Sequence, residues 1–413
     1  MNTVYSVLRS ETKQSVGYML REITHICRDM RTRAPGSVGE REAAEYMAEV
    51  LRTDCGCKDV RMELFQEHPA AFYGYFWFSM TFDILCAVCW FLSPWLSILF
   101  GCAALLLFIF QFGLYKQIID PLFPVKESVN VTAIRPCAGE CRQRIFLNGH
   151  IDAAWEFPLN YHFGGVVFEV PGVLAVAGVL FYLTLSVCTL CGAGDGVRSA
   201  ALWGFLFIPF FILVGCTYDP RRTVDGANDD LSGCYMGITL LRELERLGIQ
   251  LEHTELGVIL TGSEEAGLRG AKTWSLTHEG DYRDVPTLIL CFDTIHDPRY
   301  LMVNARDLNG TVRADPALCD AFMKAAADAG IPCRRGWVPP FGGATDNAAF
   351  TQGGFRSVSV TGLNHKLEDY YHTRRDSHDN LNTEGLENCW QALIRFVDAV
   401  EQRGGFLRWA GKD

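Results

Sequence analysis

Residues 145–152 read Ile-Phe-Leu-Asn-Gly-His-Ile-Asp, a short apolar run that ends in a histidine and an acid. The run Ile145–Asn148 is rich in β-forming residues and predicts a strand. Five further strands are predicted by similar runs, at Val60–Leu64, Val129–Ile134, Leu256–Thr261, Thr287–Phe292 and Ser357–Thr361. Helical patterns lie between them, at Leu231–Leu247, Pro316–Ala329 and Glu384–Glu401. This alternation predicts an α/β fold, a mostly parallel mixed sheet with helices on both faces.

A capping-box pattern precedes the first of the predicted strands. Ser37 and Glu40 have the spacing at which a helix N-cap and its third residue satisfy each other's backbone donors. Apolar residues then follow at helical spacing from Ala44 to Leu51. A helix is therefore expected to begin after Ser37.

The apolar residues of the chain are concentrated in four runs. The chain has 413 residues, of which 49% are hydrophobic and only 21% are charged. Each run has about 20 residues, the length that crosses roughly 30 Å of hydrocarbon. Buried helices of soluble proteins rarely extend that far without a polar face. The runs therefore predict four transmembrane helices in two hairpins, at Phe72–Leu92, which contains Asp83, and at Trp95–Tyr115, Pro171–Cys191 and Ser199–Tyr218.

The two hairpins divide the rest of the chain into three pieces. We predict a soluble domain built from residues 1–71, 116–170 and 219–413, with the hairpins occupying residues 72–115 and 171–218. Each hairpin contains two spans and so returns the chain to the side it left. One sheet can then assemble from all three pieces.

Charge and cysteine usage indicate where the soluble domain lies. The net charge of −11 argues against nucleic-acid binding, and the partner that the runs imply is the lipid bilayer. The 16 cysteines show no disulfide or zinc-finger spacing, and the N-terminus has no signal-peptide pattern, so we expect a reducing compartment. Basic residues near the spans favour a cytoplasmic domain. Lys58, Arg61, Lys116, Lys126, Arg221 and Arg222 lie on its side, and Arg198 lies on the other.

Acids and histidines follow several of the predicted strands. His150 and Asp152 come after the Ile145 run, Glu264 and Glu265 follow the Leu256 run, and Asp293 ends the next. Asp229-Asp230 opens a helix, and Tyr371-His372 lies in a late loop. Each of these alone is most often a hydrogen-bonded pair, an N-cap or a solvated face. Together they gather at the carboxyl ends of strands, where α/β proteins bind ligands, and they suit Zn²⁺ or a related ion.

These motifs resemble the ordered motif set of the M28 family of zinc metallopeptidases. The matching stretches are Gly149–Asp152, Gly226–Gly233, Ser263–Leu268, Asp293 and Tyr371–Asp376, with Arg33–Ser37 and Gly343–Asn347 also fitting. The resemblance covers residues 15–70, 127–165 and 220–403 approximately, and leaves out the four apolar runs. It implies a zinc exopeptidase fold. Together with the four apolar runs, it predicts a membrane-anchored dinuclear zinc exopeptidase, most specifically an aminopeptidase that hydrolyses short peptides.

The resemblance also implies a role for each residue of the site. His150, Asp229, Glu265, Asp293 and His372 match the metal ligands, and Asp229 bridges two zinc ions. Glu264 matches the general base, Asp152 the residue that orients His150, and Tyr371 a hydrogen-bond donor to the intermediate in some members. Two alternatives stay open. One is a glutaminyl cyclase-like enzyme, which needs one zinc, and the other is an inactive membrane receptor or scaffold.

Overall fold

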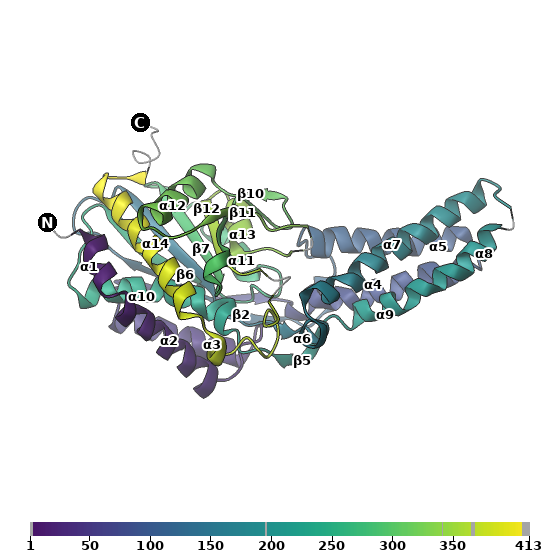
Figure 1. Ribbon diagram of the computed structural model, residues 1–413, viewed down its shortest axis with the longest axis horizontal. Coiled ribbons are helices and arrows are strands. Elements are labelled where there is room, and N and C mark those ends of the chain that lie inside the picture. Colours follow the sequence, from purple (N-terminus) through teal and green to yellow (C-terminus); the bar gives the residue numbers. More distant parts are fainter. Residues whose placement is uncertain (1–2, 195, 341, 365–367, 407–413) are drawn as a thin grey trace.

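The computed structural model describes residues 3–194, 196–340, 342–364 and 368–406. Residue 195, in the predicted connection of the second hairpin, and residues 407–413, at the end of the third predicted piece, lie outside them. A rounded α/β domain carries a long helical bundle that projects from one end, and α1 (Val4–Ser10) and the C-terminal end of α14 (Thr383–Gln402) lie at the opposite end (Figure 1).

A mixed sheet forms the centre of the α/β domain. Within the described residues it has eight strands, in the spatial order β1 (Asp59–Glu67), β2 (Lys126–Arg135), β6 (Thr254–Thr261), β3 (Gln143–His150), β7 (Thr287–Ile295), β12 (Arg356–Gly362), β8 (Leu301–Asn304) and β11 (Arg334–Gly336). The central strands β6, β3, β7 and β12 are parallel, whereas β1, β2 and β6 pair antiparallel, as do β12 and β8. The prediction of a mostly parallel mixed sheet is confirmed. The described residues also form two separate two-stranded sheets. In one, β4 (Trp155–Glu156) pairs with β5 (Asp219–Thr223), and in the other β9 (Arg306–Asp307) pairs with β10 (Val312–Arg313).

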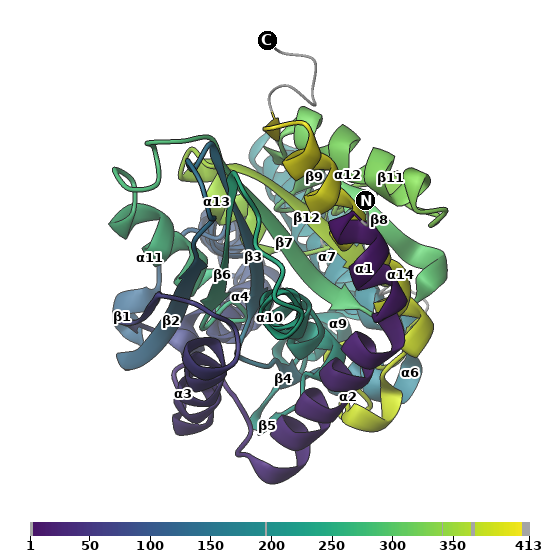
Figure 2. The same ribbon diagram turned by 90° about the vertical axis from the view of Figure 1, so that its left-hand side faces the viewer.

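Helices cover both faces of this sheet (Figure 2). Alternate strand residues such as Leu147 and Phe146 enter two separate cores because successive side chains point to opposite faces. One core packs against α1 (Val4–Ser10), α2 (Thr12–Asp29), α3 (Val38–Thr53), α10 (Ser232–Arg246), α12 (Pro316–Asp328) and α14 (Thr383–Gln402). The other packs against α11 (Arg269–Thr277) and α13 (Asp346–Gln352).

The bundle is built from the four apolar runs. Its helices are α4 (Pro69–Cys89), α5 (Pro94–Leu107) with its continuation η1 (Phe108–Gly113), α7 (Gly165–Leu190), and the broken helix α8 (Gly196–Trp203), η3 (Gly204–Phe207) and α9 (Ile208–Gly215). Among the described residues, these four helices are long and apolar enough to cross a membrane. Their outer surface exposes large apolar side chains, including Leu99, Leu106, Leu180, Val187, Leu206 and Ile212.

Two details of the bundle differ from the predicted runs. α7 begins at Gly165 rather than Pro171, so this proline lies inside the helix; helices that cross membranes tolerate internal proline where neighbouring helices and local backbone adjustments satisfy the freed carbonyl. The last run is a helix broken at Gly204, where a β-carbon would lie 2.6 Å from the hydroxyl of Tyr182. Helix α7 and the broken helix therefore approach closely at this point.

The bundle shares a core with the soluble domain. The second core continues from the sheet through Trp155 and Phe157 into aromatic residues of α4 and α7. Polar contacts fix the segment that leaves the first hairpin. Arg269 of α11 pairs with Asp120 at 2.7 Å, and Asn309 donates to the carbonyl of Gly113. The first hairpin is thus held against the domain at the end that carries the predicted site.

Candidate metal centre

The structure brings all the predicted site residues to one edge of the sheet. His150 ends β3 and lies beside Thr261 at the end of β6, and Asp293 is near the end of β7. Glu264 and Glu265 follow β6, whereas Asp229 lies in the short η4 (Ala227–Leu231) before α10. The loop after β12 supplies Tyr371 and His372. Segments far apart in the chain meet here because parallel strands end at a common edge.

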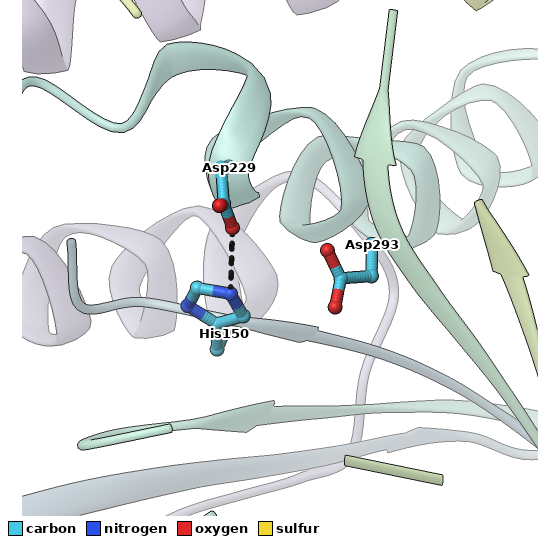
Figure 3. Close-up of side chains that lie close together, drawn as sticks. All are labelled: His150, Asp229 and Asp293. Atoms are coloured by element: carbon cyan, nitrogen blue, oxygen red, sulfur yellow. Dashed lines mark hydrogen bonds and ion pairs between the residues drawn. The ribbon is translucent and has the colours of Figure 1, made fainter. Parts of the chain in front are cut away.

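Asp229 is the centre of the cluster. Its Oδ1 lies 3.1 Å from Nε2 of His150, and its Oδ2 lies 3.2 Å from Nε2 of His372. His372 Nε2 is also 3.2 Å from Oε1 of Glu265. Figure 3 shows Asp293 facing His150 and Asp229 from its strand. All these side chains except Asp293, which is half-buried, are buried.

The described residues form three candidate metal-binding groups, of which one is His150, Glu264 and Glu265 and the other two share Asp229. The two that share Asp229 give each of two metal positions its own ligands. One group is His150, Asp229 and Asp293, the other is Asp229, Glu265 and His372, and within each the ligand atoms lie within 4.8 Å of one another. Among the described residues, Asp229 Oδ2 and Glu265 Oε1 are buried and have no hydrogen bond of good geometry, although both lie 3.2 Å from Nε2 of His372. Buried carboxylate oxygens of this kind need a cation or a donor. Imidazole and carboxylate are zinc ligands, so the residues present fit this metal.

Burial of this many acids in one place is electrostatically costly. Burial, with repulsion from Asp229, raises the pKa of Asp293 to about 7, and burial raises the pKa of Glu264 well above its usual range. Burial acts to lower the pKa of His372, but the carboxylates of Glu265 and Asp229 outweigh it and raise the pKa to about 10. The protein thus concentrates negative charge where a bound cation would offset it.

Two further acids fix the backbone that carries the ligands. Asp230 accepts hydrogen bonds from the backbone N–H groups of His150, at 2.9 Å, and of Thr294, at 3.2 Å. Asp376 accepts from the N–H of Asn228 at 2.8 Å and from that of Asp229 at 3.1 Å. Both acids belong to motifs that the sequence analysis quoted, but their positioning contacts were not predicted.

Asp152 holds the segment that contains Glu264 and Glu265. Its two carboxylate oxygens accept from the N–H groups of these glutamates, each at 3.0 Å. Its contact with His150 is longer on the side-chain oxygen, 3.5 Å from Nδ1, than on its backbone carbonyl, 3.1 Å away. The Asp152 side chain therefore contacts both His150 and the segment of Glu264 and Glu265. The prediction named only its role in orienting His150.

The turn before these glutamates rests on two buried acids that the sequence did not single out as site residues. Ser263 donates its N–H to Glu40 at 2.7 Å and its hydroxyl to Glu67 at 2.8 Å. Ser37 caps α3 as predicted, by accepting from the N–H of Glu40. The Glu40 side chain, however, reaches the N–H of Gly36 and the Ser263 turn.

Glu264 and Tyr371, the predicted base and donor, line the same cavity as the ligand cluster. Glu264 Oε2 lies 3.9 Å from Nε2 of His150. The ring of Tyr371 stacks on His372 with centroids 4.0 Å apart. The cavity encloses about 880 Å³, which includes its opening to the outside.

The first apolar helix contributes directly to the site. Tyr73 of α4 donates its hydroxyl to Oε2 of Glu265 at 3.5 Å. Phe157, near the start of α6 (Pro158–Phe163), packs its ring 4.6 Å from that of His372. Neither residue was predicted, because both aromatic side chains lie within or beside apolar stretches, where aromatic residues are common for other reasons.

We expect Asp152→Ala to weaken the site without unfolding the domain. The substitution removes two hydrogen bonds from buried N–H groups next to a ligand and to the predicted base. Loss of a partner that positions ligands typically costs about 10–100-fold in metal affinity or activity. Zinc titration followed by calorimetry measures the affinity, and Asp152→Asn, which keeps one acceptor, should fall between the wild type and Asp152→Ala. Wild-type zinc affinity and activity in Asp152→Ala would contradict this role.

Comparison with known proteins agrees with this geometry. Residues 209–397 match the model of peptidase family M28, and none of the curated proteins compared with the chain matches it significantly. The fold is similar to that of a zinc aminopeptidase from Bacillus subtilis, at 12% identity and a TM-score of 0.54, over 92% of this chain and 94% of that one. It is similar to an aminopeptidase from Aneurinibacillus sp. strain AM-1, at 14% identity and 0.54, over 94% of each chain. A glutaminyl cyclase from Fimbriiglobus ruber is also similar, at 12% identity and 0.54, over 93% and 94%.

These findings confirm the family resemblance and the fold. The M28 match and the zinc aminopeptidase fold together support a metallopeptidase hydrolase, for which zinc is the supported metal.

Proposed function

Because the chain contains a domain of peptidase family M28, we propose that it is a membrane-anchored zinc exopeptidase, most specifically an aminopeptidase that removes N-terminal residues from short peptides. The observation that carries this proposal is the pair of three-residue groups that share Asp229, with Glu264 on the wall of the same cavity. If two zinc ions bind, each of these groups would hold one of them, and Asp229 would be the ligand that both share.

Zinc bound at such a site polarises a peptide carbonyl and lowers the pKa of water toward neutrality. The chain's own residues supply the remaining functions. Glu264 takes a proton from the attacking water and passes it to the leaving amine, which a carboxylate beside the ligands but not bound to metal is suited to do. Asp152 keeps the Glu264–Glu265 segment in place, and the Tyr371 hydroxyl donates to the developing negative charge on the substrate oxygen.

A free α-amine on the substrate is the feature that should distinguish an aminopeptidase. The site is rich in carboxylates that would hold an ammonium group while the first peptide bond lies at the metal ligands. We expect the zinc-loaded protein to hydrolyse Leu-Gly-Gly and to leave its N-acetylated form intact. Chromatography of the products checks this, and chelation followed by zinc addition should abolish and restore the activity. Cleavage of the acetylated peptide alone would contradict an aminopeptidase.

A glutaminyl cyclase-like activity is the second candidate, favoured by the similarity to solved glutaminyl cyclases. Such an enzyme would convert an N-terminal glutamine to pyroglutamate and release ammonia, with a single zinc ion. Ammonia release from a Gln-Gly-Gly peptide, with no shortening of any peptide, would favour this candidate over the aminopeptidase.

We propose that the soluble domain and both termini lie in the cytoplasm. The four apolar helices are paired, so the three pieces of the domain share one side. That side carries the excess of lysine and arginine near the spans, and cytoplasmic segments are the basic ones. A reporter that is active only in the cytoplasm should work when fused to the C-terminus and fail when inserted at Gly196. The opposite result would place the domain outside.

A further inference from the structure

The helical bundle contains a cavity that adjoins the metal-ligand cluster. It lies between α4, α5, α7 and α9 and encloses about 870 Å³, part of it open to the outside. Four residues line both this bundle cavity and the site cavity: Phe76, Phe112, Phe168 and Glu169. The two cavities therefore have lining residues in common. Figure 1 shows α4, α5 and α7, the helices that line the bundle cavity, projecting together from the soluble domain.

The walls of the bundle cavity are mostly apolar, and Ser79, Asp83, Glu169 and Thr217 are the polar residues among them. Ala104, Ala175, Val176 and Val179 are among the side chains that line it, and Tyr75 packs on Phe112 with ring centroids 5.6 Å apart. An aromatic contact connects the wall to the ligands, because Phe168 stacks on Phe157 at 4.8 Å and Phe157 lies against His372. An apolar group attached to a substrate at the ligand cluster can thus continue into the bundle along a mostly apolar wall, in which Glu169 is the charged residue where the two cavities adjoin.

The bundle cavity has a defined depth. It extends along α4 from Tyr75 and Phe76 to Asp83, which is buried. At 1.5 Å per residue this distance is about 12 Å. Because a buried acid is a poor neighbour for hydrocarbon, Asp83 marks the end of the apolar part of the cavity.

A polar cleft extends from the other side of the ligand cluster. It shares Asp293, Ala344 and Tyr371 with the site cavity and continues beside β8 and β11, where Asn304 and Arg334 line it. The ligand cluster consequently lies between an apolar space within the bundle and a polar one in the soluble domain.

We infer that the substrate is an amphiphilic peptide whose N-terminal residue carries a long hydrocarbon side chain, which occupies the bundle cavity while the polar remainder lies in the cleft. This inference rests on the proposed aminopeptidase function. Hydrolysis breaks the first amide C–N bond, with the water hydroxyl passing to the carbonyl carbon and a proton to the leaving amine. The bilayer around the bundle is then a source of substrate, because a residue with a long hydrocarbon side chain partitions into it.

Peptides of the form X-Gly-Gly test the chain-length dependence. X is norvaline, norleucine, α-aminooctanoic acid or α-aminodecanoic acid, assayed with the full-length zinc-loaded protein at one fixed detergent concentration. We expect kcat/KM to rise about threefold per methylene, on the order of 100-fold over the series, because burial of each methylene favours binding of the transition state. A kcat/KM that stays constant or falls along the series would overturn the inference. A kcat/KM that rises only in peptides that carry the hydrocarbon chain on the leaving amine, or as an N-acyl group, would also overturn it.

Two variants on α7 distinguish binding of the hydrocarbon chain in the bundle cavity from a general effect of the detergent. Ala175 is buried and lines the cavity, whereas Ala177 is exposed on the same helix. Ala175→Phe should remove the chain-length dependence yet retain hydrolysis of norvaline-Gly-Gly, and Ala177→Phe should leave both unchanged. Gly172→Leu provides a second filling of the cavity, since its β-carbon would meet no atom within 4 Å. Equal effects of Ala175→Phe and Ala177→Phe would overturn the inference.

A binding measurement distinguishes failure of the inference from failure of the proposed function. An α-aminodecanoyl-Gly-Gly peptide with a diazirine at the end of its chain is irradiated with the Glu264→Gln protein, and labelled segments are identified by mass spectrometry. We expect labels on Ser79–Asp83 and on residues 175–179, reduced by unlabelled α-aminodecanoyl-Gly-Gly and not by norvaline-Gly-Gly. Absence of hydrolysis of every peptide would refute the aminopeptidase, whereas labels confined to the soluble domain, or unaffected by competition, would refute the lipid-chain site.

Discussion

Replacing Glu264 by glutamine should lower kcat by about 10²–10⁴-fold, the usual contribution of a general base, and leave the zinc content of the protein unchanged. Glutamine has the same shape as glutamate but cannot accept a proton at neutral pH. Glu264 forms a group with His150 and Glu265 but belongs to neither of the two groups that share Asp229, so its substitution leaves the ligands of those two in place. Steady-state kinetics on Leu-Gly-Gly and metal analysis of the same sample give the two quantities.

A matched control for this substitution is Glu279→Gln. Glu279 is exposed, follows α11 and has the same side chain, so the charge change is identical and the site is untouched. We expect its kcat to equal that of the wild type. A Glu264→Gln enzyme with undiminished turnover would show that Glu264 is not the base, and a loss of zinc would show that it acts mainly on the metal site.

The central strands and the long helices were predictable from local pattern. The Ile145 and Leu256 runs are mostly apolar segments followed by Gly. This pattern is typical of a buried strand of a parallel sheet, because both its faces are covered. Strands β8 and β11 were not predicted. Each has at most four residues, Leu-Met-Val-Asn in β8 and Arg-Arg-Gly in β11, and segments this short show no recognisable period. The sheet pairing, not the local sequence, makes them strands.

The site shows a similar division between ligands and their surroundings. The histidines and acids stand out because they follow apolar strands, and the structure brings them together. Tyr73 and Glu67 carry no such signal, because contact with Glu265 and Ser263 depends on how a hairpin and an edge strand pack against the domain. Long-range packing of this kind leaves no periodic trace in the sequence.

The bridging role proposed for Asp229 makes a quantitative prediction about metal stoichiometry. Asp229→Ala removes an oxygen from both ligand groups, whereas Asp293→Ala and His372→Ala each remove a ligand from one group only. We expect zinc per folded chain to fall from two to nearly zero in Asp229→Ala and to about one in each of the other two variants, because three ligands are usual at a catalytic zinc and two hold it weakly.

Elemental analysis after dialysis against a fixed free zinc concentration measures the stoichiometry, and circular dichroism shows whether each variant has kept its helices. Asp281→Ala serves as the control, since this acid is exposed and lies outside both groups, and it should retain two ions. If Asp229 is the shared ligand, Asp229→Ala should lose more zinc per chain than either Asp293→Ala or His372→Ala. Equal losses in all three would indicate one zinc ion held by the whole cluster, which is the stoichiometry of the cyclase alternative and would remove the bridging role from Asp229.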